Sequence, residues 1–167
     1  MPRSCAKPYG SVKLFAMSYL SLHSPIGDLT LFEDDGKLIS VDWGWVDGGS
    51  ETPLLTEALR QLEEYFDGDR QVFDLPMALS GTAFQQRVWQ ALQTIPYGQA
   101  LRYGELAEKL GSSPRAVGTA CGRNPLPVII PCHRVVAKDG SLGGYSGLDG
   151  IETKRSLLTL EGYPVAG

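Results

Sequence analysis

The residues with the clearest chemical potential lie in one short segment, residues 124–136. Cys132 is followed there by His133 and Arg134, and three prolines precede the cysteine. Prolines fix φ and remove backbone donors, so they predict an extended loop rather than a helix, with apolar residues anchoring Cys132 on both sides. A cysteine is nucleophilic only as its thiolate and needs a nearby base or positive charge. His133 and Arg134 are candidates for these roles.

The Cys132–His133 dipeptide by itself leaves two other interpretations open. The dipeptide alone favours a buried structural cysteine beside a hydrogen-bonded histidine, because local cysteine motifs do not transfer between families. The pair could also serve a thiol hydrolase. A direct dyad is geometrically awkward for that reaction, because adjacent residues of an extended strand point to opposite sides.

The elements that must position this segment are predicted to be mostly helical. Apolar periodicity between cap and stop signals predicts helices over residues 83–95, 103–110, 114–122 and 151–160. Thr82 and Ser113 are the expected N-caps, and Gly111 ends the second helix. The second and third helices, joined by a three-residue turn, fit the helix-turn-helix pattern.

The first half of the chain predicts a small α/β unit. Strand-like runs cover residues 19–23, 29–32 and 37–43, and an amphipathic helix covers residues 53–66. The charge balance changes and a helical pattern begins within residues 75–81. We therefore expect a support domain over residues 18–78, a second domain over residues 79–167 and a disordered basic tail over residues 1–17. Met17 is a candidate start, because patterned sequence begins just after it.

Composition excludes several classes of protein. The chain has 167 residues, 43% hydrophobic and 20% charged, which suits one or two small domains rather than a disordered chain, a coiled coil or collagen. No run approaches the ~20 apolar residues that cross a bilayer, and no secretory signal is evident, so no membrane association is expected. Three cysteines at unrelated spacings make no disulfide framework, which predicts a cytoplasmic protein.

Charge is distributed unevenly along the chain. Residues 1–79 hold 6 Lys/Arg against 13 Asp/Glu, whereas residues 80–167 hold 9 against 6. The half that carries the candidate chemistry is therefore net basic, which leaves a nucleic-acid partner open despite the overall charge of −4. A monomer is the default expectation.

Several motifs together resemble one known family. The sequence PCHRV at 131–135, preceded by Asn-Pro at 124–125 and followed by GGYSG at 143–147, closely resembles the active-site signature of the O6-alkylguanine-DNA alkyltransferases. Further similarities in the same order are FQQRVW at 84–89, IPYG at 95–98, RAVG at 115–118, Lys154 and LLTLE at 157–161. SPIG at 24–27 is similar to the opening of the family's N-terminal domain.

The resemblance implies both a fold and a reaction. The fold class is α+β: a small N-terminal α/β domain like ribonuclease H, then a mostly helical, winged-helix-like domain with a helix-turn-helix. The reaction is the irreversible transfer of an alkyl group from O6-alkylguanine, flipped out of double-stranded DNA, to a cysteine of the protein itself. O4-alkylthymine could also be a substrate. A thiolate attacks saturated carbon directly, so neither a metal nor a cofactor is expected.

The resemblance also assigns catalytic roles. Cys132 is the alkyl acceptor, His133 draws its proton through a water, and Glu161 orients His133. Asn124 braces the turn before the cysteine loop, and Tyr103 donates a proton toward the flipped base. Without the resemblance, Glu161 would be a solvated carboxylate, Asn124 a helix cap and Tyr103 an ordinary packing residue.

The remaining expected site residues bind guanine or DNA. Tyr145, Ser146, Val135 and Gly143 are expected in the guanine pocket. Arg115 is expected to enter the base stack, next to a DNA-contacting surface made of Ala116, Thr119, Ala120, Arg123 and Arg134. Cys121 is expected in the core, and a zinc site is not expected because Cys5 and His23 lack partners at ligand spacing.

A second function belongs to a different class. Alkyltransferase-like proteins sense lesions without reacting, and they resemble this family but lack the acceptor cysteine. The presence of Cys132 argues against such a non-reacting DNA-binding protein.

Overall fold

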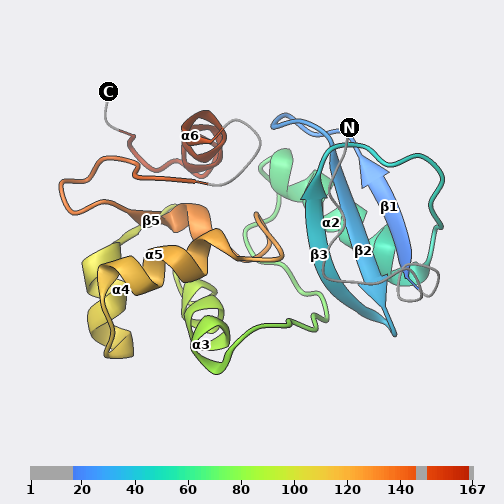
Figure 1. Cartoon of the computed structure of the whole chain (residues 1–167). Coiled ribbons are helices and arrows are strands. Elements are labelled where there is room, and N and C mark those ends of the chain that lie inside the picture. Colours follow the sequence, from blue (N-terminus) through green and yellow to red (C-terminus); the bar gives the residue numbers. More distant parts are fainter. Residues whose placement is uncertain (1–16, 146–149, 166–167) are drawn as a thin grey trace. The chain divides into compact units, whose positions relative to one another are not determined.

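The computed structural model describes residues 17–145 and 150–165. The chain divides into two units, Met1–Ala78 and Leu79–Gly167 (Figure 1). Among the described residues, no helix has the length and apolar character needed to cross a bilayer.

The first unit is built on an antiparallel three-stranded sheet. Its strands β1 (Ser18–Leu22), β2 (Leu29–Asp34) and β3 (Lys37–Trp43) follow one another in space as in sequence. Asp35 and Gly36 connect β2 to β3 with φ of 54° and 74°, the positive values that a two-residue hairpin of this sequence requires. The register pairs Leu31 with both Leu20 and Val41.

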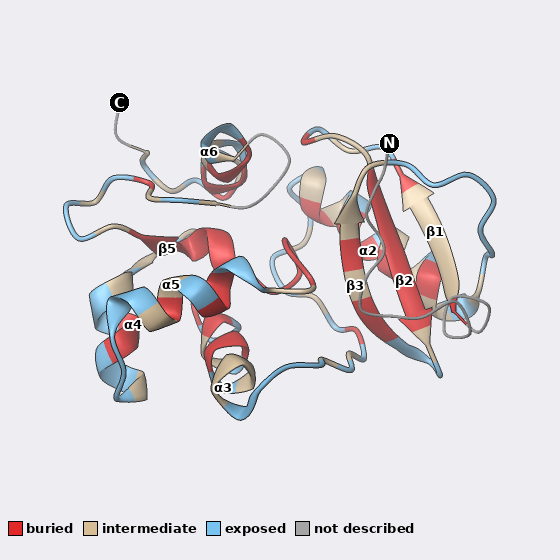
Figure 2. Ribbon diagram, in the orientation of Figure 1, coloured by how far each residue is buried: buried red, intermediate tan, exposed pale blue. Residues whose placement is uncertain are grey.

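Helix α2 (Pro53–Phe66) completes the core of this unit. Thr52 caps it by accepting a hydrogen bond from the N–H of Leu55 at 3.1 Å. Leu55 and Leu62 on α2 are fully buried, as are Leu29 and Leu31 on the sheet, and Figure 2 shows the buried faces of α2 and β2. Apolar spacing along α2 therefore corresponds to the face that is removed from water.

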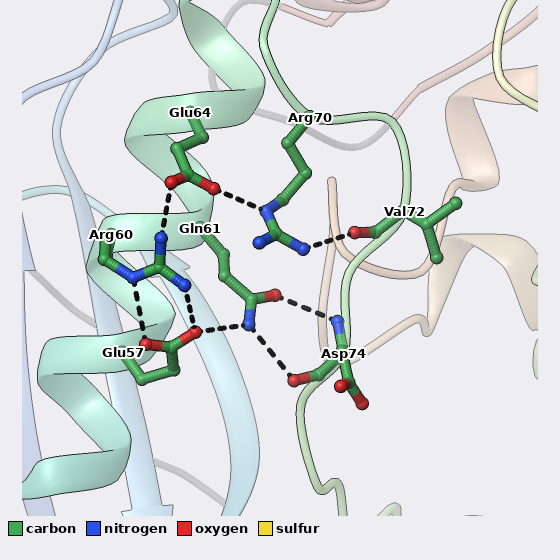
Figure 3. A network of polar contacts seen from close by, with 7 residues as sticks. All are labelled: Glu57, Arg60, Gln61, Glu64, Arg70, Val72 and Asp74. Atoms are coloured by element: carbon green, nitrogen blue, oxygen red, sulfur yellow. Dashed lines mark hydrogen bonds and ion pairs between the residues drawn. The ribbon is translucent and has the colours of Figure 1, made fainter.

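A polar network ties α2 to the segment that follows it (Figure 3). Buried Gln61 pairs with the backbone of Asp74, donating to its carbonyl at 3.1 Å and accepting from its N–H at 2.9 Å. Hydrogen bonds from Arg60 and Gln61 lower the pKa of Glu57 to about 2, so this carboxylate stays ionised. The network holds the segment close to β3, where Leu38 pairs with Met77.

The second unit is mostly helical. Its described elements are α3 (Ala83–Leu92), β4 (Leu101–Arg102), α4 (Tyr103–Leu110), α5 (Pro114–Gly122), the 3-10 turn η1 (Cys132–Arg134), β5 (Val135–Val136) and α6 (Ile151–Leu160). Strands β4 and β5 pair in parallel. Helix α3 is shorter than expected and ends at Leu92, although Ile95 beyond it is buried.

Local signals account for the pair formed by α4 and α5. Gly111 ends α4 in the left-handed conformation, with φ of 64°. Ser113 then accepts a hydrogen bond from the N–H of Ala116 at 3.2 Å, and Pro114 occupies the first turn of α5. The predicted α+β fold class, with a small N-terminal sheet and a helical C-terminal unit, is confirmed.

The backbone around the cysteine differs from the extended loop that the prolines predicted. Cys132–Arg134 form the 3-10 turn η1, closed by the N–H of Arg134 donating to the carbonyl of Pro131 at 3.0 Å. Pro131 precedes the turn, where its missing N–H is not needed. The prolines therefore exclude a helix before residue 131 but not after it.

We predict that Trp89→Phe destabilises the second unit by roughly 1–3 kcal/mol, because it removes a buried hydrogen bond and ring volume. The indole N–H of Trp89, on α3, donates to the carbonyl of Ala120 on α5 at 2.9 Å, and Trp89 is almost fully buried. Denaturant unfolding provides the measurement.

Trp45→Phe is the matched control, because the exposed Trp45 also donates its N–H to a single oxygen, at 2.9 Å on Asp47. Its expected effect is within about 0.5 kcal/mol. Equal losses in the two variants would contradict a role for Trp89 in joining α3 to α5.

Candidate active site

Cys132 lies at the wall of a cavity of about 430 Å³. The residues lining this cavity are Tyr103, Pro114, Gly118, Cys121, Gly122, Cys132, Gly144 and Tyr145. Cys132 is 7% exposed, so its thiol is accessible from the cavity rather than from the outer surface. Among the cysteines of the described residues, Cys121 and Cys132 are both free thiols.

A buried charged network lies directly behind the cysteine. Nε2 of His133 is 2.8 Å from Oε2 of Glu161, and both side chains are completely buried. Arg134 donates to both oxygens of the same carboxylate, through Nε at 2.9 Å and Nη2 at 3.0 Å. Its third donor, Nη1, reaches the carbonyl of Ile95 at 2.6 Å. A bidentate pair of this kind fixes the orientation of the carboxylate.

The network fixes the protonation state of His133. Burial lowers the pKa of His133, and the Arg134 cation lowers it further, while the Glu161 carboxylate raises it. The net direction is downward, so the ring is neutral near pH 7. With Nε2–H donating to Glu161, Nδ1 carries the lone pair. Within the described part of the chain, buried Nδ1 has no hydrogen-bond partner.

This geometry excludes a direct Cys–His dyad in the structure as it stands. One ring nitrogen of His133 bonds Glu161, and the other bonds no described residue. Because η1 is a 3-10 turn, successive side chains leave it about 120° apart. Cys132 therefore faces the cavity while His133 faces the buried carboxylate, and proton exchange between them needs an intermediary.

The pKa of the Cys132 thiol is set by opposing effects. Burial raises its pKa, while hydrogen bonding to Asn124 and the positive charge of Lys154 lower it. The Tyr145 phenol also lowers this pKa and favours the thiolate. The cavity therefore disfavours a bare thiolate but supplies the groups that stabilise one.

Lys154 is a functional candidate to which the sequence prediction assigned no role. Its side chain is fully buried on α6, and Nζ donates to the carbonyls of Val135 at 2.6 Å, Leu142, and Gly144 at 3.3 Å. Burial lowers the pKa of Lys154 to about 8, against the opposing effect of the two thiols. Its position three and four residues before the buried Leu157 and Leu158 is the sequence signal that could have identified it as inward-facing.

Asn124 forms hydrogen bonds at both ends of its amide group. Its Nδ2 donates to the carbonyl of Ile130 at 2.8 Å, and its Oδ1 accepts from the N–H of Leu126 at 2.9 Å. The side chain therefore spans the turn that leads to the cysteine.

Two tyrosines bring phenol groups to the cavity. Burial raises the pKa of Tyr103 to about 12, and the neighbouring thiols add to the shift. Burial likewise raises the pKa of Tyr145 well above its ordinary value. Both phenols therefore stay protonated at neutral pH and are available as donors.

Among the described residues, Val135 and Gly143 were expected in the guanine pocket but do not line this cavity. Val135 is buried in β5 and is not among the lining residues. Gly143 lies against the Tyr103 ring, where an added Cβ would be 3.4 Å from Cε2. Ser146 lies outside the described residues. The lining residues Cys121, Gly118 and Gly122 instead come from α5, and Cys121 is both buried, as expected, and part of the wall.

Two of the expected DNA contacts need correction. Arg134 was expected to contact phosphate, but its guanidinium is buried against Glu161, which neutralises it inside the protein. The side chain of Ala120 is buried on the inward face of α5. In contrast, Arg115, Thr119 and Arg123 are exposed and Ala116 is half-buried; Figure 2 shows exposed and buried residues alternating along α5.

The described residues contain no group of three or more His, Cys, Asp or Glu side chains arranged to hold a metal ion.

The groups gathered at the site can support nucleophilic chemistry. They are a thiol in a cavity, a neutral histidine on a buried carboxylate, a buried cation and two phenol donors.

Comparison with known proteins identifies the family. The model described as "6-O-methylguanine DNA methyltransferase, DNA binding domain" matches residues 83–163, and the one described as "6-O-methylguanine DNA methyltransferase, ribonuclease-like domain" matches residues 17–79. The chain belongs to the 6-O-methylguanine DNA methyltransferase family. The family resemblance and the ribonuclease-like character predicted for the first half are thereby confirmed.

Individual members of the methyltransferase family cover most of the chain. The constitutive methylated-DNA–protein-cysteine methyltransferase of Bacillus subtilis is 42% identical over 156 residues, which is 86% of this chain and 94% of the relative. The crystal structure of Mycobacterium tuberculosis OGT in complex with DNA is 44% identical, with a TM-score of 0.78, over 86% of this chain and 91% of that one. An O6-methylguanine DNA methyltransferase from Methanococcus jannaschii is 33% identical, with a TM-score of 0.64, over 89% and 96%.

We predict that Glu161→Gln destabilises the protein by about 3 kcal/mol or more, because it leaves the buried Arg134 guanidinium without its carboxylate. Glu152→Gln on α6 is the matched control: its carboxylate is 72% exposed and 3.6 Å from Arg155, so we expect a change within about 1 kcal/mol. Denaturant midpoints at constant m-value give the comparison. Similar midpoints for both variants would contradict a structural dependence on Glu161.

We also predict that the Lys154 ammonium titrates near pH 8 rather than at its ordinary value of 10.5, because burial penalises the charged form. It is therefore protonated below about pH 8 and neutral above it. The Cε chemical shift followed by NMR against pH measures this, with Lys154→Arg assigning the signal. An unshifted midpoint near 10.5 would contradict the assignment.

Proposed function

We propose that this protein repairs DNA by direct reversal, transferring the alkyl group of O6-alkylguanine to its own Cys132 in a single turnover. It is an enzyme of the methylated-DNA–protein-cysteine methyltransferase class whose partner is double-stranded DNA. The observation that carries the proposal is the free thiol of Cys132 at a cavity wall, backed by His133 on the buried Glu161 carboxylate, in a chain of this family.

The proposed chemical step is an in-line displacement. The Cys132 sulfur attacks the alkyl carbon, the S–C bond forms and the bond from carbon to O6 breaks. Nδ1 of His133 takes the thiol proton through a bridging water, while Glu161 holds the opposite ring nitrogen. The guanine leaves with a proton from a donor, for which we propose the Tyr103 phenol. The thioether that forms is stable, so each molecule acts once.

Lys154 and Arg134 assist without touching the alkyl group. The Lys154 cation stabilises negative charge on Cys132, while its bonds to three backbone carbonyls hold the chain around the cavity. Arg134 keeps the Glu161 carboxylate in register with His133 and lowers the pKa of the imidazole. Both effects favour a neutral base next to an ionised acceptor.

Binding of DNA is proposed through the exposed face of α5. Arg115 would occupy the space of the extruded base, with Ala116, Thr119 and Arg123 against the backbone. The excess of Lys and Arg in residues 80–167 supports this partner. In this proposal residues 79–167 bind DNA and accept the alkyl group, and residues 18–78 support them. Tyr145 would hold the flipped guanine, and Ser146 stays a prediction.

Two further points belong to the proposal. The reduced thiols Cys121 and Cys132 favour a cytoplasmic location, where thiols are kept reduced. We propose that the protein acts as a monomer. A non-reacting lesion sensor is not favoured, because the acceptor cysteine is present.

Intact-protein mass after incubation with duplex DNA carrying one O6-methylguanine tests the proposal. We expect a gain of one methyl group, no gain for Cys132→Ala, and retention of the gain in the Cys5→Ala control. Tight binding of the lesion without a mass gain would contradict alkyl transfer and favour the sensor function instead.

A further inference from the structure

A second cysteine shares the cavity with the proposed acceptor. Cys121, near the end of α5, and Cys132, at the start of η1, both line it, and both are free thiols. Both side chains are otherwise buried, at 6% and 7% exposed. The alkyl-transfer step uses only Cys132, so the thiol of Cys121 has no role in it.

The two thiols influence the same neighbours and each other. The Lys154 cation lowers the pKa of each, and ionisation of Cys132 adds to the burial that raises the pKa of Cys121 to about 12. Both thiols also raise the pKa of the Tyr103 phenol. Because such interactions weaken with distance, they support the geometric observation that the two cysteines line one cavity.

We propose that Cys121 and Cys132 are a redox pair, in which a hydroperoxide converts the two thiols into a disulfide. This disulfide reversibly blocks Cys132 as an alkyl acceptor. The chemistry of the pair is independent of alkyl transfer, while its consequence for repair rests on the proposed function.

The step balances with one hydroperoxide. The Cys132 thiolate attacks a peroxide oxygen, so an S–O bond forms, the O–O bond breaks and the departing oxygen leaves protonated, as water or an alcohol. The sulfur of Cys121 then attacks the sulfenic sulfur and gives up its proton; an S–S bond forms, and the S–O bond breaks with loss of water. Two electrons pass from the thiol pair to the peroxide.

The cavity has the features that this closure needs. A hydroperoxide fits readily in a space of about 430 Å³. A disulfide requires Cβ atoms about 4 Å apart, so closure requires the two side chains to meet within the cavity. At Gly122, the neighbour of Cys121, an added Cβ would meet no atom within 4 Å, so this side of the end of α5 is open. A resolving thiol at this place intercepts the sulfenic acid before it reaches the irreversible sulfinic stage.

Hydroperoxide treatment of the full chain tests the pair. The readouts are non-reducing peptide mass mapping and, separately, methyl transfer from O6-methylguanine DNA before and after thiol reductant. We expect a Cys121–Cys132 disulfide in the wild type and in the Cys5→Ser control, with loss of transfer that reductant restores. In Cys121→Ser, Cys132 should instead reach the sulfinic state and stay inactive after reduction.

Three results would overturn the redox pair: a thiol at Cys121 beside an over-oxidised Cys132 in the wild type, pairing of Cys132 with Cys5, or equal recovery in Cys121→Ser and wild type. The wild-type mapping needs no variant, so it decides the matter even if Cys121→Ser does not fold. Absence of methyl transfer from untreated protein would contradict the proposed function instead, because the mapping does not depend on transfer.

Discussion

The buried carboxylate of Glu161 is the constraint on which the rest of the site depends. It lies at the end of α6 and receives hydrogen bonds from His133, from two nitrogens of Arg134 and from the backbone N–H of Gly98 at 3.3 Å. A carboxylate without these partners would be far too costly to bury. Because they come from η1 and from the turn after α3, one charge fixes the end of α6 against both segments.

Lys154 is a second buried charge that is stabilised by hydrogen bonds, in this case a cation. Its ammonium group replaces lost hydration with three backbone carbonyls, and these carbonyls belong to β5 and to the segment that follows it along the cavity wall. Each buried charge therefore holds backbone or side chains in place and also affects a titratable group. Glu161 orients the neutral imidazole of His133, and Lys154 favours the Cys132 thiolate. Burial opposes that thiolate, so Cys132 is a neutral thiol in the resting protein.

Local sequence signals were sufficient for most elements of the fold. Helices α2, α4 and α6 begin and end at the predicted residues, because caps such as Thr52, stops such as Gly111 and regular apolar spacing act within a few residues of each other. The partnership of His133 with Glu161 was also anticipated, although only through resemblance to a family, since nothing local connects residues 28 positions apart.

The sequence by itself determined the fold class and the bounds of most helices, although not the end of α3, and it supplied the prediction that Cys132 is the reactive thiol. Tertiary structure decided where the neighbouring side chains point. The Arg134 side chain points inward because its guanidinium pairs with the buried Glu161 carboxylate. No local sequence signal predicts this pair. Tertiary structure also placed Cys121 in the cavity wall and bound the buried Lys154 cation to three backbone carbonyls. Long-range packing determines the partners of a buried polar group, whereas the local sequence specifies only the backbone that carries it.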